Sequence, residues 1–328
     1  MPIHSTEPTT SVWVMSTPPE SIVVVNHSGF GLPDSVADWP GVTFIDCPRE
    51  GTIPEEIDGD VVLTRTSGGP NLDDLLRRSA RWVHTVGTGV DEFPFDALHG
   101  QTLTCSRGVS GDLIGEWVFA QMLAFAKGFP QVMLSHAPEN WNADHRVGTL
   151  RGATVVIVGV GGIGTEVARL SLALDMKVIG VRRTGTTAPL PGMTVVNDLA
   201  AVIHQADHVV VAAPATPATD GLFNRAMFAR MKPGVHFVNI ARGSLVDQDA
   251  LFDALETTVA RASLDVCTPE PLPAGHWMYE HDKVFLSPHT SWFGPGAYAD
   301  LIETFQANLQ RWQTGKELLG LVDIAAGY

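Results

Sequence analysis

The chain has 328 residues and a formal net charge of −15, and hydrophobic and charged residues make up 45% and 17% of it. This composition is that of an ordinary globular protein, and the length favours two domains. The acidic balance argues against general nucleic-acid binding, so we expect no nucleic-acid partner. No charge-free apolar run is long enough to span a bilayer, so we expect no membrane segment.

The N-terminal arm and the cysteines bear on the compartment. Residues 1–20 are polar and lack the basic start and long apolar core of a secretory signal peptide. Cys47, Cys105 and Cys267 are scattered, odd in number and without zinc-ligand spacing, which fits a reducing compartment. No cluster of His and Asp has metal-ligand spacing either. We therefore expect a cytoplasmic protein without a metal site.

Short apolar runs alternate with helical patterns before residue 130. A helix capped by Asn71 is predicted over Asn71–Arg81, and a longer helix capped by Ser110 over Ser110–Phe129. The shared apolar face of the longer helix comprises Leu113, Trp117, Ala120, Leu123 and Ala124. The predicted strands are Val12–Met15 at an edge, Ser21–Asn26, Val42–Cys47, Asp60–Thr64, Trp82–Val86 and Thr102–Cys105. This alternation indicates a small doubly wound sheet.

The stretch Thr154–Arg183 combines a strand, a glycine-rich turn, a helix and a second strand. The apolar run Val155–Val158 leads into glycines with G-x-G-x-x-G spacing, and an apolar pattern of helical period follows. In this context the spacing is the fingerprint of a dinucleotide-binding turn, whose helix N-terminus binds phosphate. A purely structural glycine turn is the alternative. The residues expected to bind the cofactor here are Gly159, Gly161, Gly162, Ile163 and Gly164.

The end of the second strand indicates which dinucleotide binds. NAD sites usually end this strand with an acid that holds the ribose 2′-hydroxyl, but here Arg182, Arg183 and Thr184 follow the strand. Arginine forms bidentate, charge-assisted bonds to phosphate oxygens, so these residues favour the 2′-phosphate of NADP. A solvated basic turn is the alternative, and NAD stays an alternative cofactor.

The alternation of strands and helices resumes after this unit. His204 and His208 flank the start of a strand and are predicted to lie on the surface. Helices are predicted over Leu199–Gln205, Arg225–Met231, Gln248–Glu256 and Gly296–Thr314. The predicted strands are Thr194–Val196, His208–Ala212, Val235–Ile240, Arg261–Val266 and Lys283–Leu286.

Three of these strands are followed by residues suited to catalysis. Arg242, Glu270 and His289 each come just after a predicted strand, and in open α/β sheets function collects beyond the carboxyl ends of the strands. Arginine can hold a carboxylate or carbonyl oxygen, and histidine can transfer a proton near neutral pH. Taken singly, each residue could instead be a strand cap, a solvated loop acid or a turn residue. Together, beside a nucleotide fold, they indicate a catalytic set.

Several motifs resemble the D-isomer-specific 2-hydroxyacid dehydrogenase family, and more narrowly its glyoxylate and hydroxypyruvate reductases. The resemblance runs from about Asp60 to about Gly294. Its motifs are Val86-Gly-Thr-Gly-Val-Asp91, Pro214-Ala-Thr-Pro-Ala-Thr219, Arg242-Gly-Ser-Leu-Val-Asp247, Leu264-Asp-Val, Glu270-Pro-Leu-Pro273 and Ser287-Pro-His289.

The resemblance implies a role for each matching residue. Arg242 would hold the carboxylate and carbonyl oxygen of the substrate, His289 would be the acid that protonates the carbonyl, and Glu270 would pair with His289. The backbone of Val86 and Gly87 would grip the carboxylate from the other domain. The remaining residues that would contact the cofactor are Ala213, Pro214, Thr219, Ala241 and Asp265.

The resemblance also implies the architecture. We expect an α/β protein of two doubly wound parallel-sheet domains, with a Rossmann nucleotide domain inserted into a flavodoxin-like substrate domain. Residues 1–108 and 292–328 would form the substrate domain, residues 109–291 would form the nucleotide domain, and the active site would lie in the cleft between them. Family members are usually dimers, with the helix at Ser110–Phe129 in the interface.

The sequence therefore predicts an NADP-preferring reductase of small 2-oxoacids, with glyoxylate and hydroxypyruvate as the substrate class. Trp292, close to His289, points to a short substrate, although it could be a core or interface residue, and Thr268 stands where the family often has an acid. A bulkier 2-oxoacid stays open. The alternative of another class is a dinucleotide-sensing binding protein, similar to the corepressors that share this fold.

Overall fold

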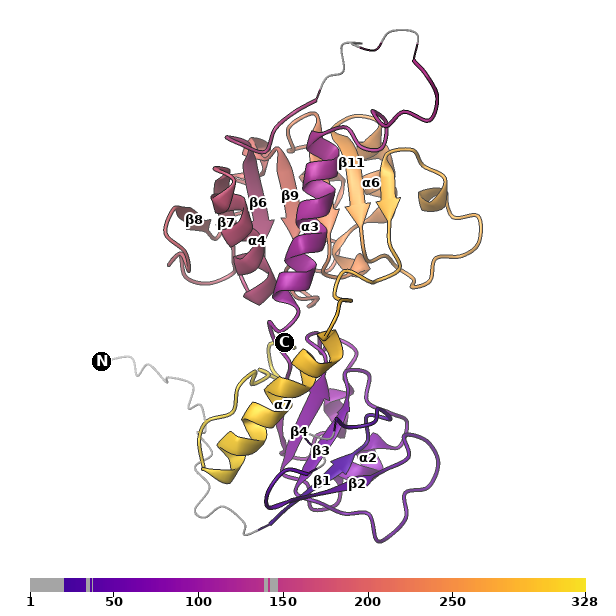
Figure 1. Cartoon of the computed structure of the whole chain (residues 1–328), viewed down its shortest axis with the longest axis vertical. Helices are drawn as coiled ribbons and strands as arrows, with labels where there is room; N and C mark the ends of the chain where they lie inside the picture. Colours follow the sequence, from indigo (N-terminus) through magenta and orange to yellow (C-terminus); the bar gives the residue numbers. More distant parts are fainter. Residues whose placement is uncertain (1–20, 34–35, 37, 139–140, 142–146) are drawn as a thin grey trace, which may run out of the picture. The chain divides into compact units, whose positions relative to one another are not determined.

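The computed structural model describes residues 21–33, 36, 38–138, 141 and 147–328. The predicted edge strand at Val12–Met15 lies outside these residues. The chain divides into two compact units, and Figure 1 colours the chain along its sequence from indigo to yellow. The first contains the described residues up to Gly87, Phe93–Ser106 and Ile302–Val322. The second contains Thr88–Glu92, Arg107–Leu301 and Asp323–Tyr328.

The first unit is built on a five-stranded parallel sheet of order β2-β1-β3-β4-β5. Its helical elements are the short α2 (Leu72–Leu76) and the 3₁₀ turn η1 (Phe95–Ala97). The part of α7 (Ala297–Gln313) that belongs to this unit packs Phe305 and Trp312 against the buried Trp82. The strands are β1 (Ile22–Asn26), β2 (Val42–Asp46), β3 (Val61–Arg65), β4 (Trp82–Val86) and β5 (Thr102–Cys105).

The second unit is built on a seven-stranded parallel sheet of order β12-β11-β10-β9-β6-β7-β8. Its helices are α3 (Gly111–Ala126), α4 (Gly162–Ala173), α5 (Arg225–Phe228) and α6 (Gln248–Leu255), with 3₁₀ turns η2 (Ile203–Gln205), η3 (Gly243–Leu245) and η4 (Trp277–Tyr279). The strands are β6 (Thr154–Val158), β7 (Lys177–Val181), β8 (Met193–Val196), β9 (His208–Val211), β10 (Val235–Asn239), β11 (Val259–Leu264) and β12 (Val284–Leu286). Two parallel α/β sheets confirm the predicted fold class.

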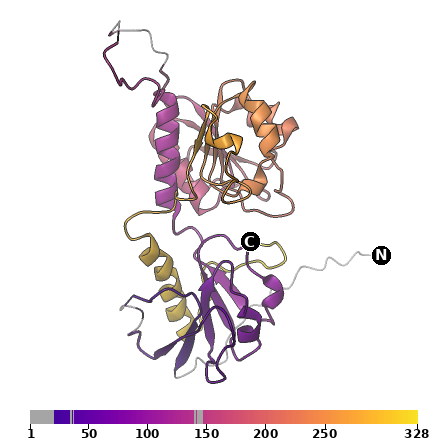
Figure 2. The same ribbon diagram turned by 90° about the vertical axis from the view of Figure 1, so that its right-hand side faces the viewer.

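Helices cover both faces of the seven-stranded sheet, as its sequence pattern requires. A central parallel strand is buried on both sides, so alternate residues of β6 enter different cores. Val155 and Ile157 pack in the core under α3 and α4, whereas Val156 and Val158 pack in the core under α5 and α6. Figure 2 shows α3 on one side of this sheet and α6, drawn in orange, on the other.

The order of strands fixes where a ligand site can form in the second unit. β6 pairs with β7 on one side and with β9 on the other, so the chain direction through the sheet reverses between β6 and β9. In open α/β sheets the crevice at such a switch point, outside the carboxyl ends of the strands, is the ligand site. The glycine turn after β6 lies at this point.

Some predicted helices differ from the structure. The segment Leu199–Gln205 forms only η2, and in the turn before it the Asp198 carboxylate accepts the N–H groups of Ala200 and Ala201. The predicted helix at Asn71–Arg81 is limited to α2. Asn71 does not cap it, since its side chain binds His27 and the carbonyl of Gly51. Ser110 precedes α3 without a side-chain cap bond.

The buried face of α3 is the opposite of the predicted one. The side chains that α3 buries are Ile114, Val118, Phe119, Met122 and Ala126, together with Gly111 and Gly115. The predicted apolar face is only partly covered, and Leu123 is 41% exposed. Both sides of this helix are apolar, so periodicity alone could not tell which side meets the sheet. Among the described residues no helix is both long and apolar enough to cross a bilayer.

Candidate active site

The glycine turn after β6 has a distinct role for each glycine. Gly159 has φ +102°, and a Cβ there would lie 2.5 Å from the carbonyl oxygen of Ala212 on the neighbouring chain segment. A Cβ on Gly164 would lie 1.9 Å from the carbonyl oxygen of Gly159, so α4 can approach β6 only without a side chain there. A Cβ on Gly161, in contrast, would meet nothing within 4 Å.

The open space at Gly161 lies directly before the first residue of α4. Gly161 is the N-cap of this helix, and Gly162 and Ile163 form its first turn. Free N–H groups at a helix N-terminus attract phosphate, and the helix dipole adds to the attraction. The turn therefore fits the pyrophosphate of a dinucleotide, which would approach the backbone where a side chain is missing.

The end of β7 presents arginines to solvent. The Nε of Arg182 donates to the carbonyl of Thr184 at 2.7 Å and thereby closes the turn after the strand. Arg183 is exposed, and its Nη2 donates to the hydroxyl of Tyr328 at 2.6 Å. No carboxylate in the described part of the chain forms an ion pair with either arginine. The positive charge of this turn is thus available to an anion.

The loop after β9 is closed by its own threonine. The hydroxyl of Thr219 donates to the carbonyl of Pro214 at 2.7 Å and accepts the N–H of Thr216 at 2.8 Å. Ala213, at the start of the loop, is buried and lies two residues after the end of the switch-point strand. The loop brings Ala213, Pro214 and Thr219 to the same sheet edge as the glycine turn.

Arg242 is held by a carboxylate that the sequence reasoning did not assign. Its Nε lies 2.9 and 3.1 Å from the two oxygens of Asp91, and its Nη1 donates to the carbonyl of Ala241 at 2.7 Å. A Cβ on Gly89 would lie 1.9 Å from Nη2 of Arg242, so the guanidinium needs a glycine there. Asp91 is the last residue of the Val86–Asp91 motif. That motif was the feature of the sequence that could have pointed to Asp91.

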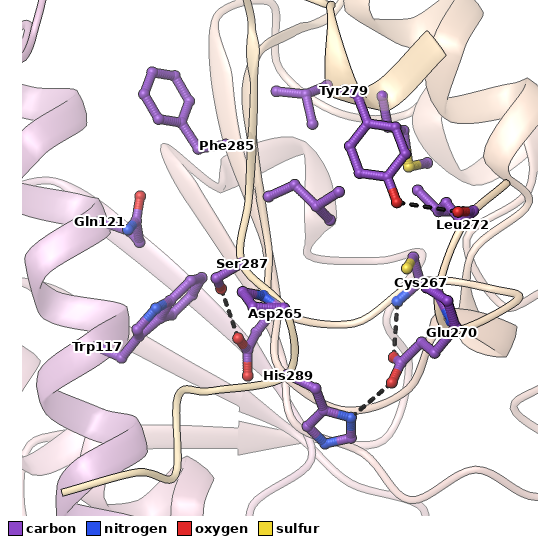
Figure 3. A pocket seen from close by; sticks show the side chains of 15 residues that line it. Trp117, Gln121, Asp265, Cys267, Glu270, Leu272, Tyr279, Phe285, Ser287 and His289 are labelled. Carbon is purple, nitrogen blue, oxygen red and sulfur yellow. Dashed lines mark hydrogen bonds and ion pairs between the residues drawn. The ribbon is translucent and has the colours of Figure 1, made fainter. Parts of the chain in front are cut away.

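His289 and Glu270 form the predicted pair. The Nδ1 of His289 lies 2.8 Å from Oε2 of Glu270, as the dashed line in Figure 3 shows. The other oxygen of Glu270 accepts the N–H of Cys267 at 3.0 Å, which fixes the carboxylate in place. With Nδ1 engaged, the Nε2 atom of His289 is the ring nitrogen left for a substrate. Both side chains remain partly exposed, so a small molecule can reach them.

The turn that carries His289 is built around the buried carboxylate of Asp265. Ser287 donates its hydroxyl to Asp265 at 2.5 Å, and the N–H groups of Thr290 and Ser291 each donate to it at 2.8 Å. The N–H of His289 donates to the carbonyl of Asp265 at 2.9 Å. Asp265, predicted to contact the cofactor, therefore also positions the turn of His289.

A pocket of about 740 Å³ opens beside Glu270 and His289. Its wall is mainly apolar, and Trp117 and Gln121 of α3 form one side of it in Figure 3. Cys267 also lines the pocket, where burial and the charge of Glu270 raise the pKa of its thiol. A protonated thiol is a poor nucleophile, in line with the prediction of a small apolar role. Trp292 is not part of this wall. Its ring stacks on that of Phe293, with the two ring centres 4.0 Å apart.

In the first unit, Val86 and Gly87 follow one another at the end of β4. Val86 is buried, and Gly87 has φ +142° with Thr66 so close that a Cβ would lie 2.7 Å from its methyl group. Val86 is the register partner of Arg65 on β3. The backbone at Val86 and Gly87 thus lies at the carboxyl edge of the five-stranded sheet, next to an arginine.

That edge carries a pair of arginines that the sequence reasoning missed. A Cβ on Gly29 would lie 3.1 Å from Cδ of Arg49 and 3.5 Å from Nη2 of Arg65, so both side chains pass the same glycine. Arg65 donates to the carbonyl of Ser28 at 2.6 Å and lies over the ring of Phe30. The pKa of Arg49 is lowered by burial and by the charge of Arg65, while Glu50 opposes the shift. The two guanidiniums form a concentrated positive charge.

His208 is buried, contrary to the prediction that it lies on the surface. Its Nδ1 lies 3.2 Å from Nδ1 of His236, whose Nε2 lies 2.9 Å from the hydroxyl of Ser263. His204 is exposed as predicted. In the described residues no group of three or more His, Cys, Asp or Glu side chains could hold a metal ion.

Comparison with known proteins places this geometry in a family. The family model described as D-isomer specific 2-hydroxyacid dehydrogenase, NAD binding domain, matches residues 119–291. The chain is 30% identical over 264 residues to an uncharacterized protein in the proB 3′ region of Corynebacterium melassecola, covering 78% of this chain and 81% of that protein. It is 32% identical over 291 residues to D-3-phosphoglycerate dehydrogenase of Pongo abelii. That match covers 85% of this chain but only about half, 53%, of the relative.

Solved structures of other proteins match the fold of nearly the whole chain. A D-isomer specific 2-hydroxyacid dehydrogenase from Xanthobacter autotrophicus Py2, in complex with NADPH and MES, is 25% identical with a TM-score of 0.80. The match covers 94% of this chain and 100% of that one. An NADPH-dependent glyoxylate/hydroxypyruvate reductase from Sinorhizobium meliloti, in complex with NADP and sulfate, is 25% identical with a TM-score of 0.77. That match covers 93% and 99% of the two chains. The chain belongs to the D-isomer-specific 2-hydroxyacid dehydrogenase family, whose members are NAD(P)-dependent oxidoreductases.

Proposed function

We propose that this protein reduces small 2-oxoacids, with glyoxylate and hydroxypyruvate as the substrate class, to D-2-hydroxyacids with NADPH. The observation that carries the proposal is the His289–Glu270 pair at 2.8 Å, on a sheet edge that also presents Arg242 and the glycine turn. The solved reductase from Sinorhizobium meliloti, with this fold and bound NADP, supports the substrate class.

The residues act on the carbonyl of the substrate as follows. The bound cofactor supplies the hydride. Arg242 binds the carboxylate and the carbonyl oxygen through its remaining N–H groups, and Asp91 holds the guanidinium in orientation. The Nε2 of His289 donates a proton to the carbonyl oxygen. Glu270 accepts the hydrogen bond from Nδ1, which stabilises the protonated ring and fixes its orientation. In this proposal the backbone of Val86 and Gly87 contributes donors for the carboxylate.

The preference for NADP is part of the proposal and is supported by Arg182 and Arg183. Both follow the strand whose end faces the adenosine ribose in this fold, and neither has a carboxylate partner in the described chain. Replacing both by alanine is expected to weaken NADPH binding about a hundredfold and NADH binding less than threefold, because only NADPH carries the phosphate. Equal losses for the two cofactors in a fluorescence titration would contradict the preference.

We further propose a homodimer and a cytoplasmic location. The partly covered apolar side of α3 and the exposed Phe129, Met133 and Leu134 that follow it support an interface between two copies. The proposed domains are residues 1–108 with 292–328, and residues 109–291. The three cysteines of the sequence, scattered and odd in number, support a reducing compartment.

Arg49 and Arg65 favour a second candidate substrate, a 2-oxoacid that carries another anionic group. They form a concentrated positive charge at the same sheet edge of the first unit as Val86. The curated relative from Pongo abelii is named as acting on a phosphorylated acid. Phosphorylated hydroxypyruvate is therefore the probe that separates the two substrate classes.

The deciding experiment follows the oxidation of NADPH and NADH with glyoxylate, hydroxypyruvate, phosphorylated hydroxypyruvate, pyruvate and a bulky 2-oxoacid. Arg242→Ala is expected to lower kcat/KM at least a hundredfold. The matched control is Arg225→Ala, which removes an exposed arginine that pairs with Asp253. A variant at Arg242 with near wild-type activity would show that the site is wrongly assigned. Tight dinucleotide binding without turnover of any acid would instead favour the sensing function.

A further inference from the structure

The last residues of the chain contact the nucleotide-binding unit at one of its arginines. Residues Asp323–Tyr328 belong to this unit by their contacts. The hydroxyl of Tyr328 accepts a hydrogen bond from Nη2 of Arg183 at 2.6 Å. The Tyr328 ring centre lies 5.3 Å from the guanidinium carbon of Arg183 and 5.9 Å from that of Arg107. Arg183 and Tyr328 are 145 positions apart in the sequence.

The contact is supported by a closed turn. The N–H of Asp323 donates to the carbonyl of Tyr328 at 3.0 Å, and the N–H of Gly327 donates to the carbonyl of Asp323 at 2.9 Å. The Asp323 carboxylate also accepts the N–H of Ala326 at 3.0 Å. These bonds tie the two ends of the segment together, so the backbone of Tyr328 is held by its own turn.

The chemistry of this pair suits an anion. Because the Tyr328 oxygen accepts from Arg183, its own O–H is left to donate to another group. Arg183 has further N–H groups besides the one that donates to this oxygen. The ring offers its negative face to two guanidiniums and reduces their mutual repulsion. No described carboxylate forms an ion pair with Arg107, Arg182 or Arg183.

We propose that Tyr328 is a specificity-determining residue of the cofactor site: its hydroxyl and the Arg183 guanidinium together bind the 2′-phosphate of NADP. The ring holds Arg183 at the turn after β7, where this phosphate is proposed to lie. The inference rests on the proposed preference for NADP and adds to it a residue from the far end of the chain. If Tyr328 instead only occupied the hydrogen-bond donors of Arg183, it would compete with the phosphate. Removing its hydroxyl would then tighten the binding of the phosphate.

Binding of two small nucleotides by the full-length protein tests this proposal. Adenosine 2′,5′-bisphosphate carries the 2′-phosphate and 5′-AMP lacks it, and isothermal titration reads both without any turnover. Tyr328→Phe is expected to raise the Kd of the bisphosphate about tenfold, the effect of losing one hydrogen bond to a charged group, and to leave that of 5′-AMP unchanged. Tyr328→Ala is expected to raise it further, because Arg183 loses its support.

The control and the contrary outcomes separate the possible explanations. Ile324→Ala changes an exposed side chain of the same turn and should leave both Kd values unchanged. If Tyr328→Phe binds the bisphosphate as tightly as the wild type, or more tightly, the proposal is wrong, and tighter binding would show that the tyrosine blocks the site. If the wild type does not distinguish the two nucleotides, the preference for NADP and the role of Tyr328 are both refuted. Thermal unfolding confirms that each variant is folded.

Discussion

His289 has a backbone conformation that few residues other than glycine adopt. Its φ is +54°, in the left-handed region, where a residue with a side chain is strained. The N–H groups of Thr290 and Ser291, together with the Ser287 hydroxyl, all bind the Asp265 carboxylate and hold the turn in this form. The strain is therefore tolerated because a buried acid over-determines the turn, and the imidazole is directed toward Glu270.

The carboxylate of Glu270 is expected to matter for turnover rather than for substrate binding. In Glu270→Gln, the amide can still contact Nδ1 of His289 but cannot stabilise a positive charge on the ring. We expect kcat to fall about a hundredfold while KM changes less than threefold. Glu280→Gln, an exposed acid that follows η4, is the control. A fall in kcat/KM caused by KM alone would argue that Glu270 only shapes the pocket.

The buried histidines predict how stability depends on pH. Burial lowers the pKa of His208 to about 4 and that of His236 well below its ordinary value. The unfolded chain binds protons below about pH 6.5, whereas these folded side chains do not. The contribution of these two histidines to the free energy of unfolding is thus fully present above about pH 7. It should decline as the pH falls below about 6.5, by about 1.4 kcal/mol per pH unit for each such histidine.

Urea unfolding between pH 7.5 and pH 4.5 checks this dependence. His208→Asn is expected to lower the stability at pH 7.5 by about 1–3 kcal/mol, and to reduce the pH slope below pH 6.5 by one proton. His204→Asn, at the exposed histidine nearby, should change neither quantity. An unchanged slope in His208→Asn would show that His208 titrates alike in the folded and unfolded states.

At the scale of elements, the βαβ unit of β6, α4 and β7 contains one glycine that matters for stability and another that is expected to matter for dinucleotide binding. Gly164→Ala places a methyl group 1.9 Å from the carbonyl oxygen of Gly159, so α4 must move away from β6. We expect a loss of about 3 kcal/mol or more in the free energy of unfolding, as for an overpacked core.

The matched variant in the same turn is Gly161→Ala. Its methyl group meets nothing in the protein within 4 Å, so we expect a change in stability below about 1 kcal/mol. The same methyl group would stand where the pyrophosphate is proposed to approach the backbone, so dinucleotide affinity should fall at least tenfold. Chemical unfolding and nucleotide titration measure both effects. Equal destabilisation by the two variants would mean that Gly161 is a structural glycine.

For the whole molecule, the question is what covers the outer side of α3. Leu123 is 41% exposed there, next to further apolar side chains, and a homodimer would bury them. Leu123→Lys is expected to convert the proposed dimer to a monomer in analytical ultracentrifugation. Leu174→Lys, at a leucine that is 40% exposed at the end of α4, should leave the dimer intact. A wild-type protein that sediments as a monomer would refute the proposed assembly.

The sequence by itself determined the features that depend on neighbouring residues or on the direction of strands. The glycine turn of Gly159–Gly164 is local, so its spacing was sufficient to predict it. The meeting of Glu270 and His289 was predictable because parallel strands end at one edge of a sheet. The resemblance in motifs then gave the family, which the comparisons confirm.

Only the tertiary structure decided the contacts between distant segments. The pairing of Arg242 with Asp91 spans 151 positions, and that of Arg183 with Tyr328 spans 145. The burial of His208 and the choice of the buried side of α3 were decided in the same way. In each case, several side chains of similar chemistry were available along the chain. Packing selects among them because burial energy depends on which surfaces meet, and a linear pattern does not contain that information.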